Sequence, residues 1–163
     1  MDEKTESLNA RCLYKKYVRG TGAEALVVLK TGLVCHLTRK VALAIQTSSI
    51  KVHINTKIIK HLYDKKPAEE FEFVIDNIHV IVKFPEEIYR NPKGKRGDFS
   101  FIKTIDGKKY IVSLEINETD LEGGKKEVIN YVVTAFRIRK ESYLKNYQQV
   151  WSWTTETQEK IIS

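Results

Sequence analysis

The hydrophobic and polar positions along the chain predict helices first and strands later. Val128–Arg139 is the longest strand candidate and is dense in β-branched and aromatic residues. Both of its alternate rows are apolar over most of their length, so we expect it inside a sheet that is covered on both faces. Thr134 interrupts one row, and the other row ends in Arg137 and Arg139. A central strand of this kind can deliver a hydroxyl group and guanidinium groups to the edge of a cleft.

A β-hairpin is predicted just before this strand. Its signal is Asp106-Gly107, a dipeptide typical of two-residue hairpin turns, between the alternating segments Asp98–Ile105 and Lys108–Asn117. A two-residue turn pairs Phe101 with Val112, so the apolar rows of the two strands meet. One face of the hairpin is therefore expected to join the core, and the other is half-polar, as in a sheet with an open binding surface.

Helical spacing predicts two helices in the middle of the chain and one at its end. Thr56–Lys65 follows Asn55, which is a favourable N-cap residue. Pro67–Val82 repeats its apolar residues three and four positions apart, and Pro67 suits a first helical turn. The last helix is expected to start at residue 140, because three aromatic residues then lie at four-residue intervals. These are Tyr143, Tyr147 and Trp151.

The first half of the chain has weaker signals. Ala25–Leu29 fits a strand or a short helix about equally, and a helix is expected over Thr38–Thr47 with Thr38 as its N-cap. Short strands are expected at Ile50–Ile54 and Glu87–Arg90, the second at an edge. Residues 1–49 are then an added cap, a partner-binding segment or part of the fold, and the pattern leaves these three open.

Composition bounds the protein class. A chain of 163 residues is expected to form one domain with a hydrophobic core, and its apolar runs are too short to span a bilayer. Cys12 and Cys35 are isolated, so we expect reduced cysteines and a cytoplasmic protein without a membrane partner. The formal net charge of +7 makes polyanions, and nucleic acid first, the expected partners.

The candidate chemistry is that of a nuclease without a metal or cofactor. The four histidines lack the spacing of a metal site, and no serine-nucleophile elbow is present. His61 falls on the polar face of its predicted helix and can titrate near neutral pH, although an ordinary solvated helix face explains it at least as well. The remaining candidates are cations or hydrogen-bonding groups. The cations are Lys57, Lys95, Arg96, Lys103 and Arg137, and the others are Ser113, Glu115 and Thr134.

Five short segments carry a resemblance to a known family. In chain order they are Ile58–Tyr63, Ile88–Asn91, Tyr110–Glu115, Val132–Arg137 and Tyr143-Leu144. As a series, they resemble the phage and mobile-element nucleases of the barnase–EndoU–colicin–RelE superfamily, with the Val-Thr-Ala-Phe strand followed by Tyr-Leu as the most specific part. The similarity covers Ile50–Trp153, which would make 50–153 the nuclease domain, 1–49 an extension or cap and 154–163 a tail.

The resemblance implies an α+β fold and a function. The fold would have N-terminal helices followed by a four-stranded antiparallel β-sheet, and we expect the C-terminal helix after it. The activity would be that of a metal-independent endoribonuclease that uses the ribose 2′-OH. RNA, tRNA included, and an immunity or antitoxin protein would be its partners. The candidate catalytic residues are His61, Lys103, Glu115 and Thr134, and the candidate substrate-binding residues are Lys57, Lys95, Arg96 and Arg137. Lys95, Arg96 and Lys103 compete for the phosphate.

Two other functions fit the same residues. One is a non-catalytic nucleic-acid-binding module of a phage or mobile element, for which the basic turn Asn91–Gly97 would hold phosphates. The other is a structural or protein-interaction domain, in which the charged segments are solvated surface. Cleavage of RNA in the presence of EDTA separates the nuclease from both.

Overall fold

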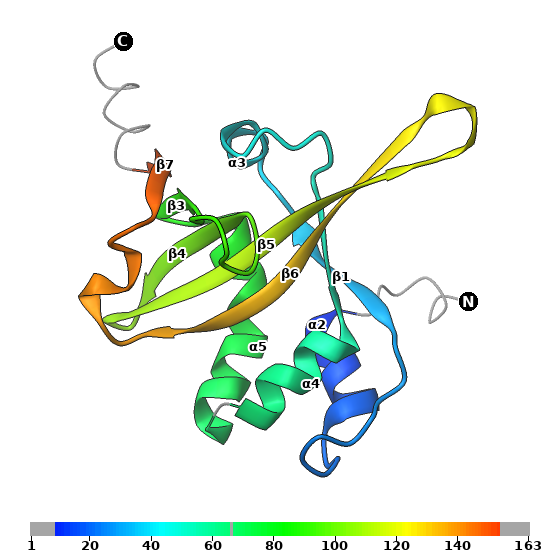
Figure 1. Ribbon diagram of the computed structural model, residues 1–163. Coiled ribbons are helices and arrows are strands. Elements are labelled where there is room, and N and C mark those ends of the chain that lie inside the picture. Colours follow the sequence, from blue (N-terminus) through cyan, green and yellow to red (C-terminus); the bar gives the residue numbers. More distant parts are fainter. Residues whose placement is uncertain (1–8, 66, 154–163) are drawn as a thin grey trace.

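A seven-stranded mixed β-sheet forms the centre of the computed structural model, which describes residues 9–65 and 67–153 (Figure 1). The sheet has the order β1-β2-β6-β5-β4-β3-β7. Its strands have these bounds: β1 Thr31–His36, β2 Lys51–Asn55, β3 Glu87–Arg90, β4 Phe99–Ile105, β5 Lys108–Asp120, β6 Lys126–Ile138 and β7 Gln148–Ser152. Neighbouring strands are antiparallel except β2 and β6, which pair in parallel.

Short helical segments complete the described chain. The helices are α2 Ala10–Leu13, α3 Arg39–Ala44, α4 Thr56–Lys65 and α5 Ala68–Lys83. One π-helical turn, η1 Tyr14–Val18, continues α2, and two 3₁₀ turns follow later, η2 Glu122–Gly124 and η3 Glu141–Leu144. The tip of the long β5–β6 hairpin contains η2 and projects beyond the rest of the sheet (Figure 1).

The core lies between one sheet face and the layer formed by α2, η1, α4 and α5. Phe73 of α5 stacks on Tyr110 of β5, with ring centroids 4.9 Å apart, which fixes Tyr110 and its row on the helical face. Val112 and Leu114 follow Tyr110 at alternate positions and are fully buried in the same cluster. The opposite face of β4, β5 and β6 is therefore the face that the helices leave open.

Several local predictions are confirmed. α4 has the predicted bounds, and Asn55 Oδ1 accepts from the Ile58 N–H at 3.0 Å. The side chain of Thr38 caps α3 in the same way. Asp106 and Gly107 have positive φ angles of 52° and 76°, as a type I′ turn requires, and Phe101 pairs with Val112.

The predicted four-stranded antiparallel sheet is wrong. Strands β1 and β2 extend the sheet beyond β6, and the β2–β6 pair makes it mixed rather than antiparallel. The helix expected from residue 140 is also wrong, because the chain there forms η3 and then β7. β7 pairs with β3, which therefore lies inside the sheet and not at its edge. Pairing with β3 gives hydrogen-bond partners to the backbone groups of both strands. This gain decides against the helix that the four-residue aromatic spacing predicted.

The described part of residues 1–49 belongs to the same folded unit. Leu13 and Val18 have no exposed surface and pack in the core cluster that also holds α4 and α5. Asn130 of β6 adds a polar joint: its Nδ2 donates to the carbonyl oxygens of Ser49 and Lys51 at 2.8 and 3.0 Å, and its Oδ1 accepts from Thr47 Oγ1 at 2.9 Å.

Candidate functional site

A row of hydroxyl groups crosses the open face of the sheet. Ser100 of β4 pairs with Ser113 of β5, and Ser113 pairs with Thr134 of β6. The two serines are buried, and their Oγ atoms lie 2.8 Å apart, within hydrogen-bond distance. Thr134 is half-buried at the end of this row. Alternation along β5 puts the row opposite the core face, so these hydroxyls face the open side.

A β-bulge lies directly beside Thr134. The register changes from Ser113↔Thr134 to Leu114↔Val132, so Val133 is the extra residue on β6. Bulges bend a strand and re-aim side chains near functional sites. Arg137 pairs with Tyr110 on the helical face, so the bulge does not bring Thr134 and Arg137 to one side.

The basic loop between β3 and β4 is held over this row. Asn91 Nδ2 donates to the carbonyl oxygens of Arg96 and Gly97 at 2.9 and 3.2 Å. Asn91 Oδ1 accepts from Ser100 Oγ at 2.6 Å. The hydroxyl row is thereby linked to the loop backbone, and the loop that carries Lys95 is fixed above the sheet.

Aromatic side chains form the other wall. Phe136 of β6 packs against Tyr143 with ring centroids 5.3 Å apart, and Tyr143 packs against Tyr147 at 5.7 Å. Lys95 Nζ lies 5.9 Å from the centroid of the Tyr143 ring, within reach of a cation–π interaction. Burial, together with a hydrogen bond to Tyr143, raises the pKa of Tyr147 well above its ordinary value, so this hydroxyl keeps its proton at neutral pH.

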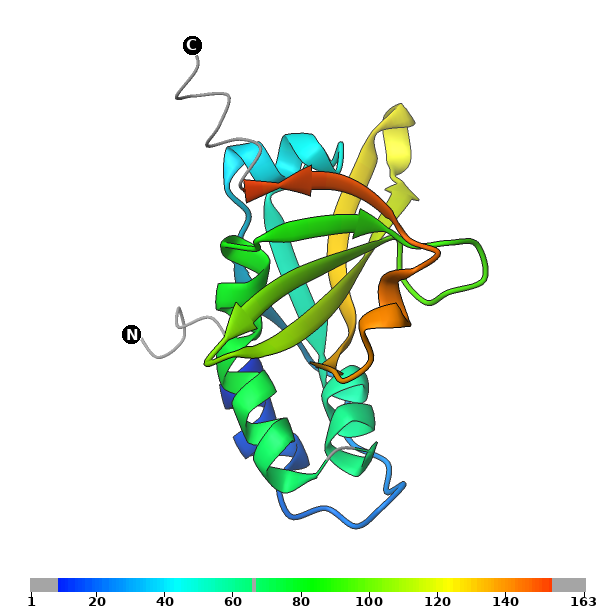
Figure 2. The same cartoon turned by 90° about the vertical axis from the view of Figure 1, so that its left-hand side faces the viewer.

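Helix α4 brings His61 to the same place. β2 ends at Asn55 after pairing with β6 near its middle, and α4 then contacts β6 beyond that point. Figure 2 shows η3 and the loop before β4 on the side of the sheet away from α5, with α4 below η3. A cavity of about 240 Å³ results. It is lined by His61, Lys95, Arg96, Ser113, Thr134, Phe136, Tyr143 and Tyr147.

Five of the predicted site residues thus line one cavity: His61, Lys95, Arg96, Ser113 and Thr134. His61 and the two cations are exposed, so they are open to a ligand from solvent. The cations and the aromatic rings suit a nucleotide phosphate and base, while the hydroxyls can hold phosphate oxygens. We call this the His61 cavity.

The other four predicted residues are placed elsewhere. Lys103 Nζ donates to the Phe84 carbonyl oxygen at 2.8 Å and lines a different cavity. Arg137 lines a pocket on the helical side together with Arg139 and Glu70. Glu115 pairs with Tyr131 beyond the bulge, and Lys57 is exposed one turn before His61. Neither of these two is among the residues that line the His61 cavity.

Sequence reasoning missed the aromatic wall and, in the hydroxyl row, Ser100 with its partner Asn91. Tyr143 and Tyr147 were expected on one face of a helix, whereas the chain forms the η3 turn there and exposes part of both rings to the cavity. A usable signal existed for Ser100, since the hairpin parity put it on the half-polar face beside the candidate Ser113. Asn91 had no such signal, because its partners depend on the loop conformation.

No family model, curated protein or solved structure matches the chain. Within residues 9–65 and 67–153, no group of three or more His, Cys, Asp or Glu side chains could hold a metal ion. No helix in that part of the chain is long and apolar enough to cross a membrane.

Proposed function

We propose that the chain is an endoribonuclease that works without a metal ion and binds RNA in the His61 cavity. The observation that carries this proposal is the convergence of His61, the Lys95–Arg96 pair and Thr134 on one cavity from α4, a loop and β6. A titratable imidazole, fixed cations and a hydroxyl are the groups that cleavage through a 2′-OH needs. The superfamily resemblance, with its helical histidine and strand threonine, supports the same reaction.

The proposed step needs no group outside the cavity. His61 takes the proton of the ribose 2′-OH, the 2′-oxygen forms a bond to phosphorus, and the bond from phosphorus to O5′ breaks. The Lys95 ammonium supplies a proton to the leaving 5′-oxygen, and Arg96 stays charged beside the phosphorane oxygens. Thr134 and the protonated Tyr147 donate hydrogen bonds to the phosphorane oxygens. The products are a 2′,3′-cyclic phosphate and a 5′-hydroxyl end.

The test compares the native protein with His61→Ala on total tRNA and on single-stranded RNA, with EDTA present. We expect the substitution to lower the cleavage rate ~10²–10⁴-fold, the usual contribution of a general acid or base. End mapping of the native products should show 2′,3′-cyclic phosphates. His36→Ala is the matched control, because His36 is also exposed but belongs to β1.

Two outcomes contradict different parts of the proposal. Native protein that leaves both RNA substrates intact at high enzyme concentration argues against a ribonuclease. Full activity in a folded His61→Ala protein argues only against the role of His61. Circular dichroism of each variant separates lost chemistry from lost structure.

A second candidate function is RNA binding without cleavage. The observation in its favour is that no carboxylate is among the described residues that line the His61 cavity, while three aromatic rings and two cations are. Such a surface stacks bases and neutralises phosphates without requiring proton transfer. It predicts binding that weakens steeply with salt and no product on a gel.

A further inference from the structure

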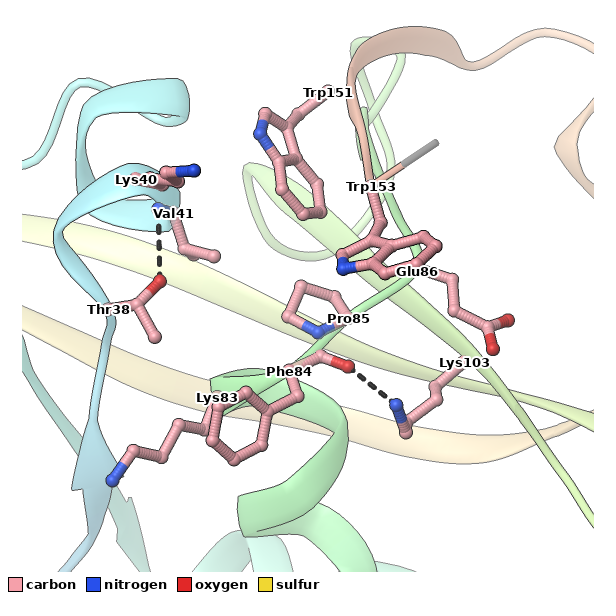
Figure 3. A pocket seen from close by; sticks show the side chains of 10 residues that line it. All are labelled: Thr38, Lys40, Val41, Lys83, Phe84, Pro85, Glu86, Lys103, Trp151 and Trp153. Carbon is pink, nitrogen blue, oxygen red and sulfur yellow. Dashed lines mark hydrogen bonds between the residues drawn. The ribbon is translucent and has the colours of Figure 1, made fainter. Parts of the chain in front are cut away.

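A cavity of about 500 Å³ lies away from the His61 cavity, between α3, the C-terminal end of α5 and β7 (Figure 3). We call it the tryptophan cavity. It is lined by Thr38, Lys40, Val41, Lys83, Phe84, Pro85, Glu86, Lys103, Trp151 and Trp153. None of these residues lines the His61 cavity. Its volume is in the range of sites for small organic ligands.

Aromatic rings dominate its walls. Trp151 pairs with Ile88, which is buried in the core, so its indole lies on the helical side of the sheet. Phe84 and Trp153 are 55% and 58% exposed, whereas large aromatic side chains are usually mostly buried. In Figure 3 these rings and Pro85 surround a gap that α3 closes on the far side. A flat aromatic ligand would bury their exposed surface.

The indole N–H of Trp151 lacks a partner. Its Nε1 atom is buried, and no hydrogen-bond acceptor for it exists among the described residues. A buried indole N–H usually donates a hydrogen bond, because leaving it unpaired costs free energy. Figure 3 shows this nitrogen on the side of the ring that faces α3. The cavity thus offers a donor to a ligand that carries an acceptor.

The polar groups at the mouth are mainly cationic. Lys40, Lys83 and Lys103 line the cavity with one carboxylate, Glu86. Glu86 Oε1 accepts from the Thr104 N–H at 3.0 Å, and Lys103 is held by the Phe84 carbonyl oxygen. Lys83 Nζ lies 5.8 Å from the centroid of the Phe84 ring. A negative charge attached to an aromatic ligand would therefore meet Lys83 beside the Phe84 ring.

The structure assigns to the tryptophan cavity a nucleotide, bound through its base and its phosphate. The base lies against the aromatic wall and accepts a hydrogen bond from the Trp151 indole, and the phosphate lies beside Lys83. Phosphate alone would leave the aromatic wall unused, and an apolar ligand would leave the indole N–H unpaired. This assignment goes beyond the proposed ribonuclease function and does not depend on it. A free nucleotide and the phosphorylated end of an RNA share this chemistry.

The chain carries its own probe of this cavity. It contains two tryptophans, Trp151 and Trp153, and both line it, so intrinsic tryptophan fluorescence reports on this site and not on the His61 cavity. We expect AMP to change the fluorescence saturably, with calorimetry giving the same dissociation constant. Adenosine and inorganic phosphate should each bind at least about tenfold more weakly, because each lacks one half of the interaction.

Variants link the signal to the assigned contacts. Lys83→Ala should weaken AMP binding by roughly tenfold, a factor that corresponds to about 1.4 kcal/mol. Lys15→Ala, which removes an exposed lysine of η1, is the matched control and should leave the dissociation constant unchanged. Trp153→Phe keeps an aromatic ring and leaves Trp151 as the single reporter.

RNA oligonucleotides with and without a 5′-phosphate form the last arm, measured in His61→Ala so that any cleavage does not consume them. Tight binding of the phosphorylated oligonucleotide without binding of AMP identifies an RNA end as the source. Competition by AMP identifies a free nucleotide. Absence of a saturable signal with every nucleotide, or an unchanged dissociation constant in Lys83→Ala, overturns the assignment whatever the ribonuclease test shows.

Discussion

Gly97, at the end of the basic loop, meets two separate demands. Its φ angle is +87°, a backbone conformation that residues other than glycine rarely adopt. A Cβ atom there would also lie 3.0 Å from Val133 Cγ2 and 3.2 Å from the Leu114 carbonyl oxygen. The loop can therefore approach the bulge beside Thr134 only because residue 97 has no side chain.

Gly94 provides the matched comparison for a test of this approach. It has a similar φ of +89°, but nothing lies within 4 Å of its Cβ position. We expect Gly94→Ala to lower the free energy of unfolding by about 1–2 kcal/mol through backbone strain alone. Gly97→Ala should cost about 1–3 kcal/mol more, because the clash is added.

Denaturant unfolding of both variants measures this difference. The same pair also reports on the site, since displacement of the loop in Gly97→Ala should lower RNA cleavage or binding more than Gly94→Ala does. Equal stability losses in the two variants would mean that the loop moves away from the bulge at little cost.

Among the elements, α4 has a second polar attachment besides its N-cap. Lys60 is 6% exposed, and its ammonium donates to Thr21 Oγ1, the Gly22 carbonyl oxygen and Asp64 Oδ1 at 3.0, 2.5 and 2.8 Å. Asp64 Oδ2 accepts from the Glu24 N–H at 3.0 Å. The loop after η1 is thus tied to the helix that carries His61.

These contacts make stability depend on pH in a defined direction. The hydrogen bond from Lys60 is the main cause that lowers the pKa of Asp64 below its ordinary 3.8. A lowered pKa in the folded state means that the ionised carboxylate stabilises the fold above about pH 4, and that this contribution is lost as the pH falls through the lowered pKa. Asp64→Asn should therefore be less stable than the native protein near neutral pH.

Unfolding curves of the native protein and Asp64→Asn, recorded between neutral and acidic pH, measure the effect. The gap between the two free energies of unfolding should close in acid, below about pH 4. Asp106→Asn is a suitable control, since Asp106 is exposed in the hairpin turn and asparagine also tolerates its positive φ. A gap that stays constant with pH would show that the charge of Asp64 is not what the fold uses.

At the scale of the whole molecule, the N-terminal segment covers part of the core. Leu13 and Val18 are fully buried against the helical layer, and β1 pairs along β2. A chain that starts at residue 50 would expose that apolar surface and leave an edge of β2 without a partner. We therefore expect that residues 50–153 alone do not form a complete core.

Deletion of residues 1–49 tests this conclusion. We expect the shortened chain to lose cooperative unfolding, with more exposed apolar surface, because it lacks the groups that cover α4 and β2. A deletion of residues 1–8 is the control, since it leaves α2 and every later element in place. A shortened chain that unfolds cooperatively with native stability would support an independent domain at 50–153.

Local elements were predictable wherever their cause lies within a few neighbouring residues. The bounds of α4 depend on its Asn55 cap and its apolar spacing, and the β4–β5 register depends on the turn at Asp106-Gly107. The opposite faces of Thr134 and Arg137 followed from strand alternation. The last segment was mispredicted because the four-residue spacing of its aromatic residues is also compatible with a 3₁₀ turn and a strand.

By itself, then, the sequence determined which segments are helices or strands over most of the chain, and which few residues carry titratable, cationic or hydroxyl groups. Only the tertiary structure decided how many strands join the sheet, that β2 lies parallel to β6, and that His61, Lys95 and Thr134 share a cavity whereas Lys103 and Arg137 do not. The physical reason is range: caps and turns act between close neighbours, while sheet order and cavities depend on burial shared by residues far apart in the chain.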